Sequence, residues 1–184
     1  MRYLNPILAA GLLTFAMSAA NATSATLTPV GGNQHTDITA TVSEQVALTV
    51  PATAAFSVPD VNSSAATTSL SVTASSIVLT DGHRLRLSLQ PAADNFSGPT
   101  GSTHDLSVAN VSWGAVAWTG GAGGVGTAGA LVDSSTASEV ATSTANAPTL
   151  STTALVLTLA SDPLIDRAGD YTLRANWIVE SVAP

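Results

Sequence analysis

The stretch AGDYTLRANWIVESVAP, Ala168–Pro184, decides the fold. From Tyr171 its residues alternate, and those on one side are largely apolar: Tyr171, Leu173, Ala175, Trp177 and Val179. A period of two residues is that of a β-strand that buries one face. We therefore predict a strand from Tyr171 to Val182 that sets Tyr171, Leu173 and Trp177 against a core.

The same alternation recurs through most of the chain. It is clearest in Arg84–Gln90, where the leucines are expected to point inward and Arg84, Arg86, Ser88 and Gln90 outward. Asp81-Gly82, just before it, is typical of a hairpin turn. Leu155, Leu157 and Leu159 share one face of a further strand. This pattern predicts an all-β protein, an antiparallel sandwich of about seven or eight strands in a single domain.

Three segments fit this pattern less simply. Apolar residues alternate from Ile38 to Val50, but Glu44 falls on the apolar side, so we expect a bulge or strand break there. The glycine-rich segment 119–129 is expected to be a flexible loop, and 136–147 could hold one helical turn. Trp113 and Trp118 would face opposite sides of an unbroken strand, unless a bulge at Gly114 brings them together.

The front of the chain predicts export. Arg2 precedes an apolar run, Ile7–Met17, that is too short to span a bilayer, and Ala20-Asn21-Ala22 suits signal peptidase. We expect residues 1–22 to be a secretory signal peptide. Residues 23–36 then form an N-terminal extension or first strand, and 37–184 the sandwich domain. The mature protein is expected to be secreted or at the cell surface, with no transmembrane segment.

Composition excludes several classes of function. The chain has no cysteine, so it forms no disulfide and no thiolate metal site. It has no lysine, and its formal net charge is −7, so nucleic acid is a poor partner.

Candidate sites for chemistry are sparse. Gly121–Gly126 fits G-x-G-x-x-G, but no helix signal follows, and we expect no cofactor. Asp162, Asp166 and Asp170 share one turn region and are weak candidates for calcium, although their spacing does not match a calcium loop. The histidines are scattered, and no nucleophile motif is present. We expect no enzyme activity, no catalytic residues and no metal site.

The segment RAGDYTL, Arg167–Leu173, resembles the start of the sixth strand of immunoglobulin-like domains. Gly169 and Tyr171 match that pattern, and Leu173 stands where a cysteine usually lies. The resemblance implies an immunoglobulin-like sandwich in which the Tyr171 hydroxyl bonds to backbone upstream. Such a domain would continue with a seventh strand, and we expect none after Val182, so that the sandwich is incomplete at this edge.

An incomplete sandwich is similar to bacterial pilus subunits of the chaperone–usher and spore-coat-U-like kinds. The resemblance implies that a strand donated by the next subunit fills the gap. In this chain Thr23–Gln34 would be the donor, with Ala25 and Leu27 as donated residues and a hinge at Pro29 and Gly31-Gly32. The partners would be further copies of the chain or other surface subunits.

Other interpretations stay open. The sandwich could be complete, with Thr23–Val30 as its first strand. The protein could instead be a secreted carbohydrate-binding module, with Trp118 stacking on a glycan. A third interpretation is a secreted hydrolase.

Overall fold

A computed structural model describes residues 37–120 and 124–183 and divides the chain into two units, Met1–Ala40 and Thr41–Pro184. In the first unit the described residues, Asp37–Ala40, are exposed and lie outside any strand. The alternating segment from Ile38 to Val42 does not form the expected strand, and these two side chains are 92% and 72% exposed.

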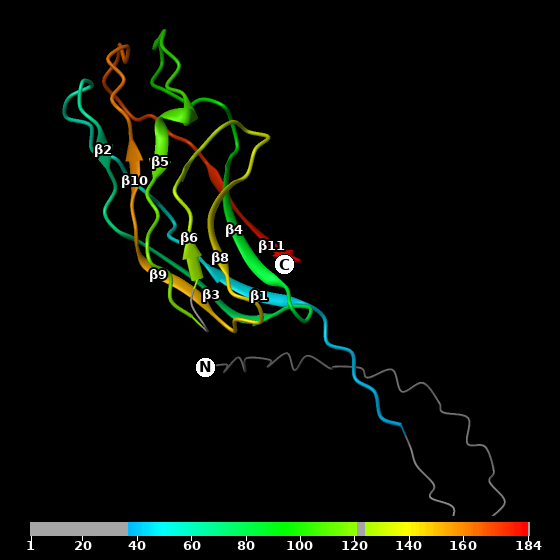
Figure 1. Ribbon diagram of the computed structural model, residues 1–184. Coiled ribbons are helices and arrows are strands. Elements are labelled where there is room, and N and C mark those ends of the chain that lie inside the picture. Colours follow the sequence, from blue (N-terminus) through cyan, green and yellow to red (C-terminus); the bar gives the residue numbers. More distant parts are fainter. Residues whose placement is uncertain (1–36, 121–123, 184) are drawn as a thin grey trace, which may run out of the picture. The chain divides into compact units, whose positions relative to one another are not determined.

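Within these residues the regular structure of the second unit is almost entirely β, which confirms the predicted class (Figure 1). A 3-10 helix spans Val108–Asn110, and the strands are β1 (Gln45–Thr49), β2 (Ala65–Ala66), β3 (Leu70–Val78), β4 (Arg84–Pro91), β5 (Val111–Trp113), β6 (Gly124–Gly126), β7 (Gly129–Ala130), β8 (Ser138–Ser143), β9 (Leu150–Leu155), β10 (Leu157–Leu159) and β11 (Ala175–Val182). Several are only two or three residues long, so the strands outnumber the prediction. None of the described helical structure has the length and apolar character needed to cross a membrane.

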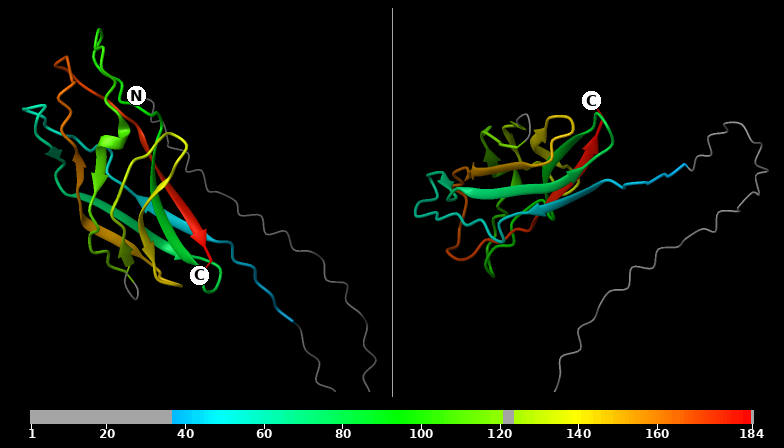
Figure 2. Two further views of the ribbon diagram at one scale, coloured as in Figure 1. Left: turned by 45° about the horizontal axis from the view of Figure 1, so that its top comes forward. Right: turned by 90° about the horizontal axis from the view of Figure 1, so that it is seen from below.

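The strands form an antiparallel sandwich (Figure 2). One sheet has the order β1-β3-β9 and a second the order β2-β10-β5-β7. Because only Val156 separates β9 from β10, these two sheets continue into one another as one layer. The third sheet, β11-β4-β8-β6, makes the other layer.

The core lies between the layers and follows the alternation of the strands. Leu85, Leu87 and Leu89 of β4 are buried as predicted, whereas Ser88, expected to face outward, is buried as well. Both Trp113 and Trp118 are in the core. The chain leaves the strand after Trp113, and residues 114–117 have no regular structure, so the two rings need not face opposite sides.

The Asp81-Gly82 turn forms, but it does not make a hairpin. His83 N–H donates to Thr80 O at 2.9 Å, and Gly82 has a φ of +80°. However, β3 pairs with β1 and β9, whereas β4 pairs with β11 and β8. The turn therefore carries the chain from one layer to the other.

Part of the glycine-rich segment forms strands, which corrects the prediction of a flexible loop there. Gly124–Gly126 is β6 and pairs with β8, which lies in the segment that could have held one helical turn. A Cβ atom on Gly126 would overlap Val116 O and lie 2.9 Å from Trp118 Cδ1. Glycine is therefore needed here because β6 packs directly on the core, and a flexible loop would make no such demand.

Candidate functional site: an apolar groove between two edge strands

Two edge strands border one open side of the sandwich. β1 is the last strand of its sheet and pairs with β3, while β11 is the last strand of the facing layer and pairs with β4. No ladder among the described strands joins β1 to β11. The prediction that Tyr171–Val182 forms a strand is confirmed for Ala175–Val182.

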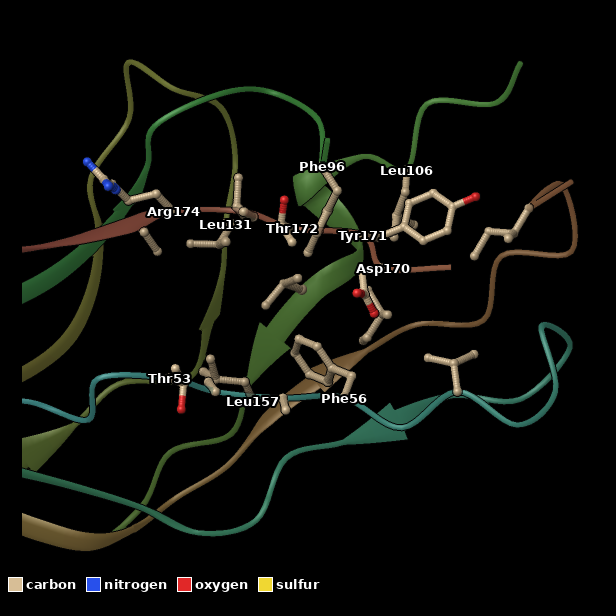
Figure 3. Close-up of a pocket in the computed structure, with 18 of the residues that line it drawn as sticks. Thr53, Phe56, Phe96, Leu106, Leu131, Leu157, Asp170, Tyr171, Thr172 and Arg174 are labelled. Atoms are coloured by element: carbon tan, nitrogen blue, oxygen red, sulfur yellow. The ribbon is translucent and has the colours of Figure 1, made fainter. Parts of the chain in front are cut away.

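A groove of about 990 Å³ runs along this side. One wall is the segment that follows β1, residues 51–56, and the other is the segment that leads into β11, residues 165–175. Figure 3 shows Phe56 and Leu157 on one side of the cavity and Phe96, Leu106 and Tyr171 on the other. The lining is thus mainly apolar and aromatic.

The backbone of β11 turns hydrogen-bonding groups toward the groove. Arg174 O accepts from Ala92 N–H at 2.8 Å, so the backbone groups of Arg174 face β4. Because peptide groups point alternately to the two sides of a strand, the N–H and C=O groups of Ala175, Trp177 and Val179 face the open side. Such a row of free groups is a template for another strand.

The side chains at both edges are incompletely covered. Val46 and Leu48 of β1 and Trp177 and Val179 of β11 pack on the core, yet each stays only half-buried. An apolar strand laid between the edges would remove this surface from water, which is favourable in proportion to the area covered.

Glu44 links the start of β1 to the end of β11, beyond the residues that line the groove. Its Oε1 accepts from Thr80 N–H at 2.6 Å and from the Ser181 hydroxyl at 2.9 Å. His83 Nδ1 lies 2.9 Å from Ser181 Oγ and 3.7 Å from Glu44 Oε1. The Thr80 N–H is the main cause that lowers the pKa of Glu44. The carboxylate therefore bridges the start of β1 and the end of β11 without joining them as a ladder.

The groove wall around Tyr171 is fixed by a polar network. The Tyr171 hydroxyl donates to Arg167 O at 3.1 Å, the upstream backbone bond expected of this tyrosine. Asp166 accepts from Thr103 N–H at 3.0 Å and from the hydroxyls of Thr103 and Ser102. These bonds, first those from Thr103, hold the pKa of Asp166 far below its usual value. The network ties the loop at 99–104 to the groove wall.

The calcium candidates do not converge. Asp162 lies 2.8 Å from His104 Nε2 and accepts from Asn110, while Asp166 is bound to Ser102 and Thr103. Burial alone would raise the pKa of Asp162, but the hydrogen bonds from His104, Leu164 N–H and Asn110 together with the interaction with His104 outweigh it, and the pKa is lowered. Asp170 lines the groove. Across the described ranges no three His, Asp or Glu side chains are placed to hold a metal ion.

Trp118 is not a surface stacking residue, which corrects the prediction. It is 4% exposed and lies beneath Gly124 and Gly126 of β6. Its Nε1 is buried without a hydrogen-bond partner among the described atoms. The ring is covered because Gly124 and Gly126 of β6 have no side chains, which lets this strand pack closely against it.

The groove brings together Tyr171, Leu173 and Trp177, the described members of the predicted assembly set. Ala25 and Leu27 lie outside the described residues. The sequence analysis did not identify Phe56 and Phe96, because each is a single aromatic residue in a segment without a regular pattern. It also missed the role of Glu44, although the polar interruption of an apolar face was noticed.

No family model, curated protein or solved structure matches this chain. The groove is therefore the feature from which a function can be argued.

Proposed function

We propose that this is an exported, non-catalytic structural protein of the cell surface that assembles by strand addition. The observation that carries the proposal is the apolar groove where the chain leaves β1 and enters β11, together with the open edges of these two strands. Export is supported by the signal-peptide pattern in residues 1–22. The resemblance of Arg167–Leu173 to immunoglobulin-like pilus subunits supports the same interpretation.

The groove suits an extended peptide better than a compact ligand. It is bordered by edge strands, and one of them, β11, offers backbone donors and acceptors along its open side. An added strand gains affinity from main-chain hydrogen bonds and specificity from pockets that take alternate side chains. The half-buried Trp177 and Val179 provide the apolar surface for those side chains.

The proposed occupant is Thr23–Gln34 of a second copy, with Ala25 and Leu27 facing the core. This segment has alternating residues and precedes the sandwich in the chain. A donor that fills the groove of another copy, while its own groove stays free for a third, is a head-to-tail contact. Such contacts generate open chains of subunits when the rotation does not close a ring.

Deleting Thr23–Gln34 from the mature protein tests this function. Size-exclusion chromatography and negative-stain microscopy should find ladders or filaments for the mature chain and monomers for the deletion variant. A full-length Leu27→Asp chain should also stay monomeric, because a carboxylate in the groove would be buried without a partner. If the deletion variant assembles like the parent, strand addition by this segment is wrong.

The two other interpretations gain no support from the geometry. The glycan-binding candidate depended on an exposed Trp118, which is buried. For hydrolysis, the Ser102 hydroxyl donates to Asp166 at 2.8 Å, so it is not presented to the His104 imidazole as a nucleophile would be.

A further inference from the structure

We propose that the Glu44 carboxylate receives the N-terminal ammonium group of Thr23 from the neighbouring copy. This inference rests on the proposed function and specifies how the donated segment sits in the groove. Its first residue lies beside Glu44 and Ser181, at the end of β11. Its hinge, Gly31-Gly32, leaves beside Tyr171.

Glu44 has the position and the capacity for this contact. It accepts a hydrogen bond from Ser181, near the carboxyl end of β11, and so lies beside the end of the open edge. The bonds from Thr80 N–H and the Ser181 hydroxyl end on Oε1, and the Thr80 side chain also bonds to the carboxylate. The side chain is 41% exposed, which leaves room for a donor to approach. An ammonium group offers a charge-assisted hydrogen bond to such an oxygen.

The lengths of donor and acceptor agree. Cleavage after Ala22 gives an eight-residue stretch, Thr23–Val30, before the glycine hinge, and β11 has eight residues. If Thr23 lies opposite Ser181 in an antiparallel pair, Ala25 lies opposite Val179 and Leu27 opposite Trp177. Directly opposed residues share a face, so both donated side chains point to the core. The same register places their backbone groups against the free groups of β11.

The polarity follows from charge and from sheet geometry. With the first residue at Glu44, the donor runs antiparallel to β11, as in every ladder described for this protein. The opposite polarity would place the ammonium group beside Asp170, which lines the groove. It would also set the uncharged pair Gly31-Gly32 against Glu44. The two polarities therefore pair the ammonium group with different carboxylates.

The test measures how strongly the amino-terminal charge of the donated peptide interacts with the carboxylate of Glu44. The acceptor is the mature full-length chain with Leu27→Asp, which keeps its groove free. The probe is a peptide with the sequence of Thr23–Gly32 and a dye at its carboxyl end, made with a free or an acetylated amine. Fluorescence anisotropy should find the free amine binding about two- to five-fold more tightly, the range of a partly exposed ion pair. When Glu44→Gln is added to the acceptor, the two peptides should bind equally.

Two control acceptors separate the outcomes. Asp105→Asn removes an exposed carboxylate away from the groove lining and should preserve the preference for the free amine. If instead Asp170→Asn abolishes the preference, the polarity is reversed and the inference is wrong. The inference is also overturned if acetylation weakens binding equally in the acceptors with and without Glu44→Gln. If neither peptide binds any acceptor, the proposed function itself fails, which is a different result. Circular dichroism melting of each variant confirms that its fold is retained.

Discussion

Tyr171 shows how one hydroxyl can fix a groove wall. Its hydroxyl donates to Arg167 O, four residues upstream, and its ring lies so close to Gly98 that a Cβ there would be 2.8 Å from Cε1. The ring and the hydroxyl thus hold the segment before β11 against the loop that contains Gly98.

Tyr171→Phe should lower the free energy of unfolding by about 1 kcal/mol, because it removes one hydrogen bond and keeps the ring. Urea unfolding of the monomeric Leu27→Asp chain, with and without the change, measures the effect. Tyr171→Leu should cost more, since it also removes the contact with Gly98. Equal stability of the Phe variant and the parent would show that the hydroxyl bond does not contribute.

Because the pKa of Asp166 is lowered by its hydrogen bonds, we expect the folded protein to lose stability in acid. Its pKa is lowered in the folded protein by bonds from Thr103 and Ser102. Its contribution is therefore complete above the unfolded pKa of about 3.9 and is lost as the pH falls below that value toward the folded pKa. Urea midpoints measured from pH 6 to pH 2 should fall less steeply for Asp166→Asn than for the parent. The Asp105→Asn variant should keep the steeper fall.

At the scale of the strand, the packing of β6 on the core requires that its glycines carry no side chain. Gly126→Ala should destabilise the fold by about 1–3 kcal/mol, because its Cβ would overlap Val116 O and crowd Trp118. Gly114→Ala is the matched control, since a Cβ there meets nothing within 4 Å. Thermal melting of both variants checks this. Similar melting temperatures for the two would contradict the packing of β6 on the core.

In β11, substitutions at the adjacent residues Trp177 and Asn176 should affect assembly differently. Trp177→Glu puts a charge into the groove and should abolish filaments, whereas Asn176→Glu changes an exposed neighbour outside the lining and should leave them intact. Negative-stain microscopy at matched protein concentration is the measurement. Filaments in both variants would exclude this face of β11 from the interface.

Some strands could be predicted from the sequence because their alternation is local. β4 and β11 were found in this way, since one side chain in two faces the core whatever the strand pairs with. β6 could not be found, because glycines carry no alternation and its reason for being a strand is the distant Trp118.

At the scale of the whole molecule, one wall of the groove could be predicted from the sequence and the other could not. Tyr171, Leu173 and Trp177 lie on one alternating stretch, and their shared face places them on one wall of the groove. The opposite wall, including Phe56, comes from a part of the chain more than a hundred residues earlier in the sequence. No local pattern records which irregular segments meet across a sandwich, and the bridge from Glu44 to Ser181 is equally non-local.

The turn at Asp81-Gly82, which crosses between layers, has a consequence for the speed of folding. None of the described ladders joins two strands that are consecutive in the chain. Most strand pairings therefore join residues that are distant in the sequence, and proteins of this kind fold in milliseconds to seconds. A newly synthesised copy accordingly spends that interval with half-formed, aggregation-prone sheets, so escort by a holding factor would raise its yield.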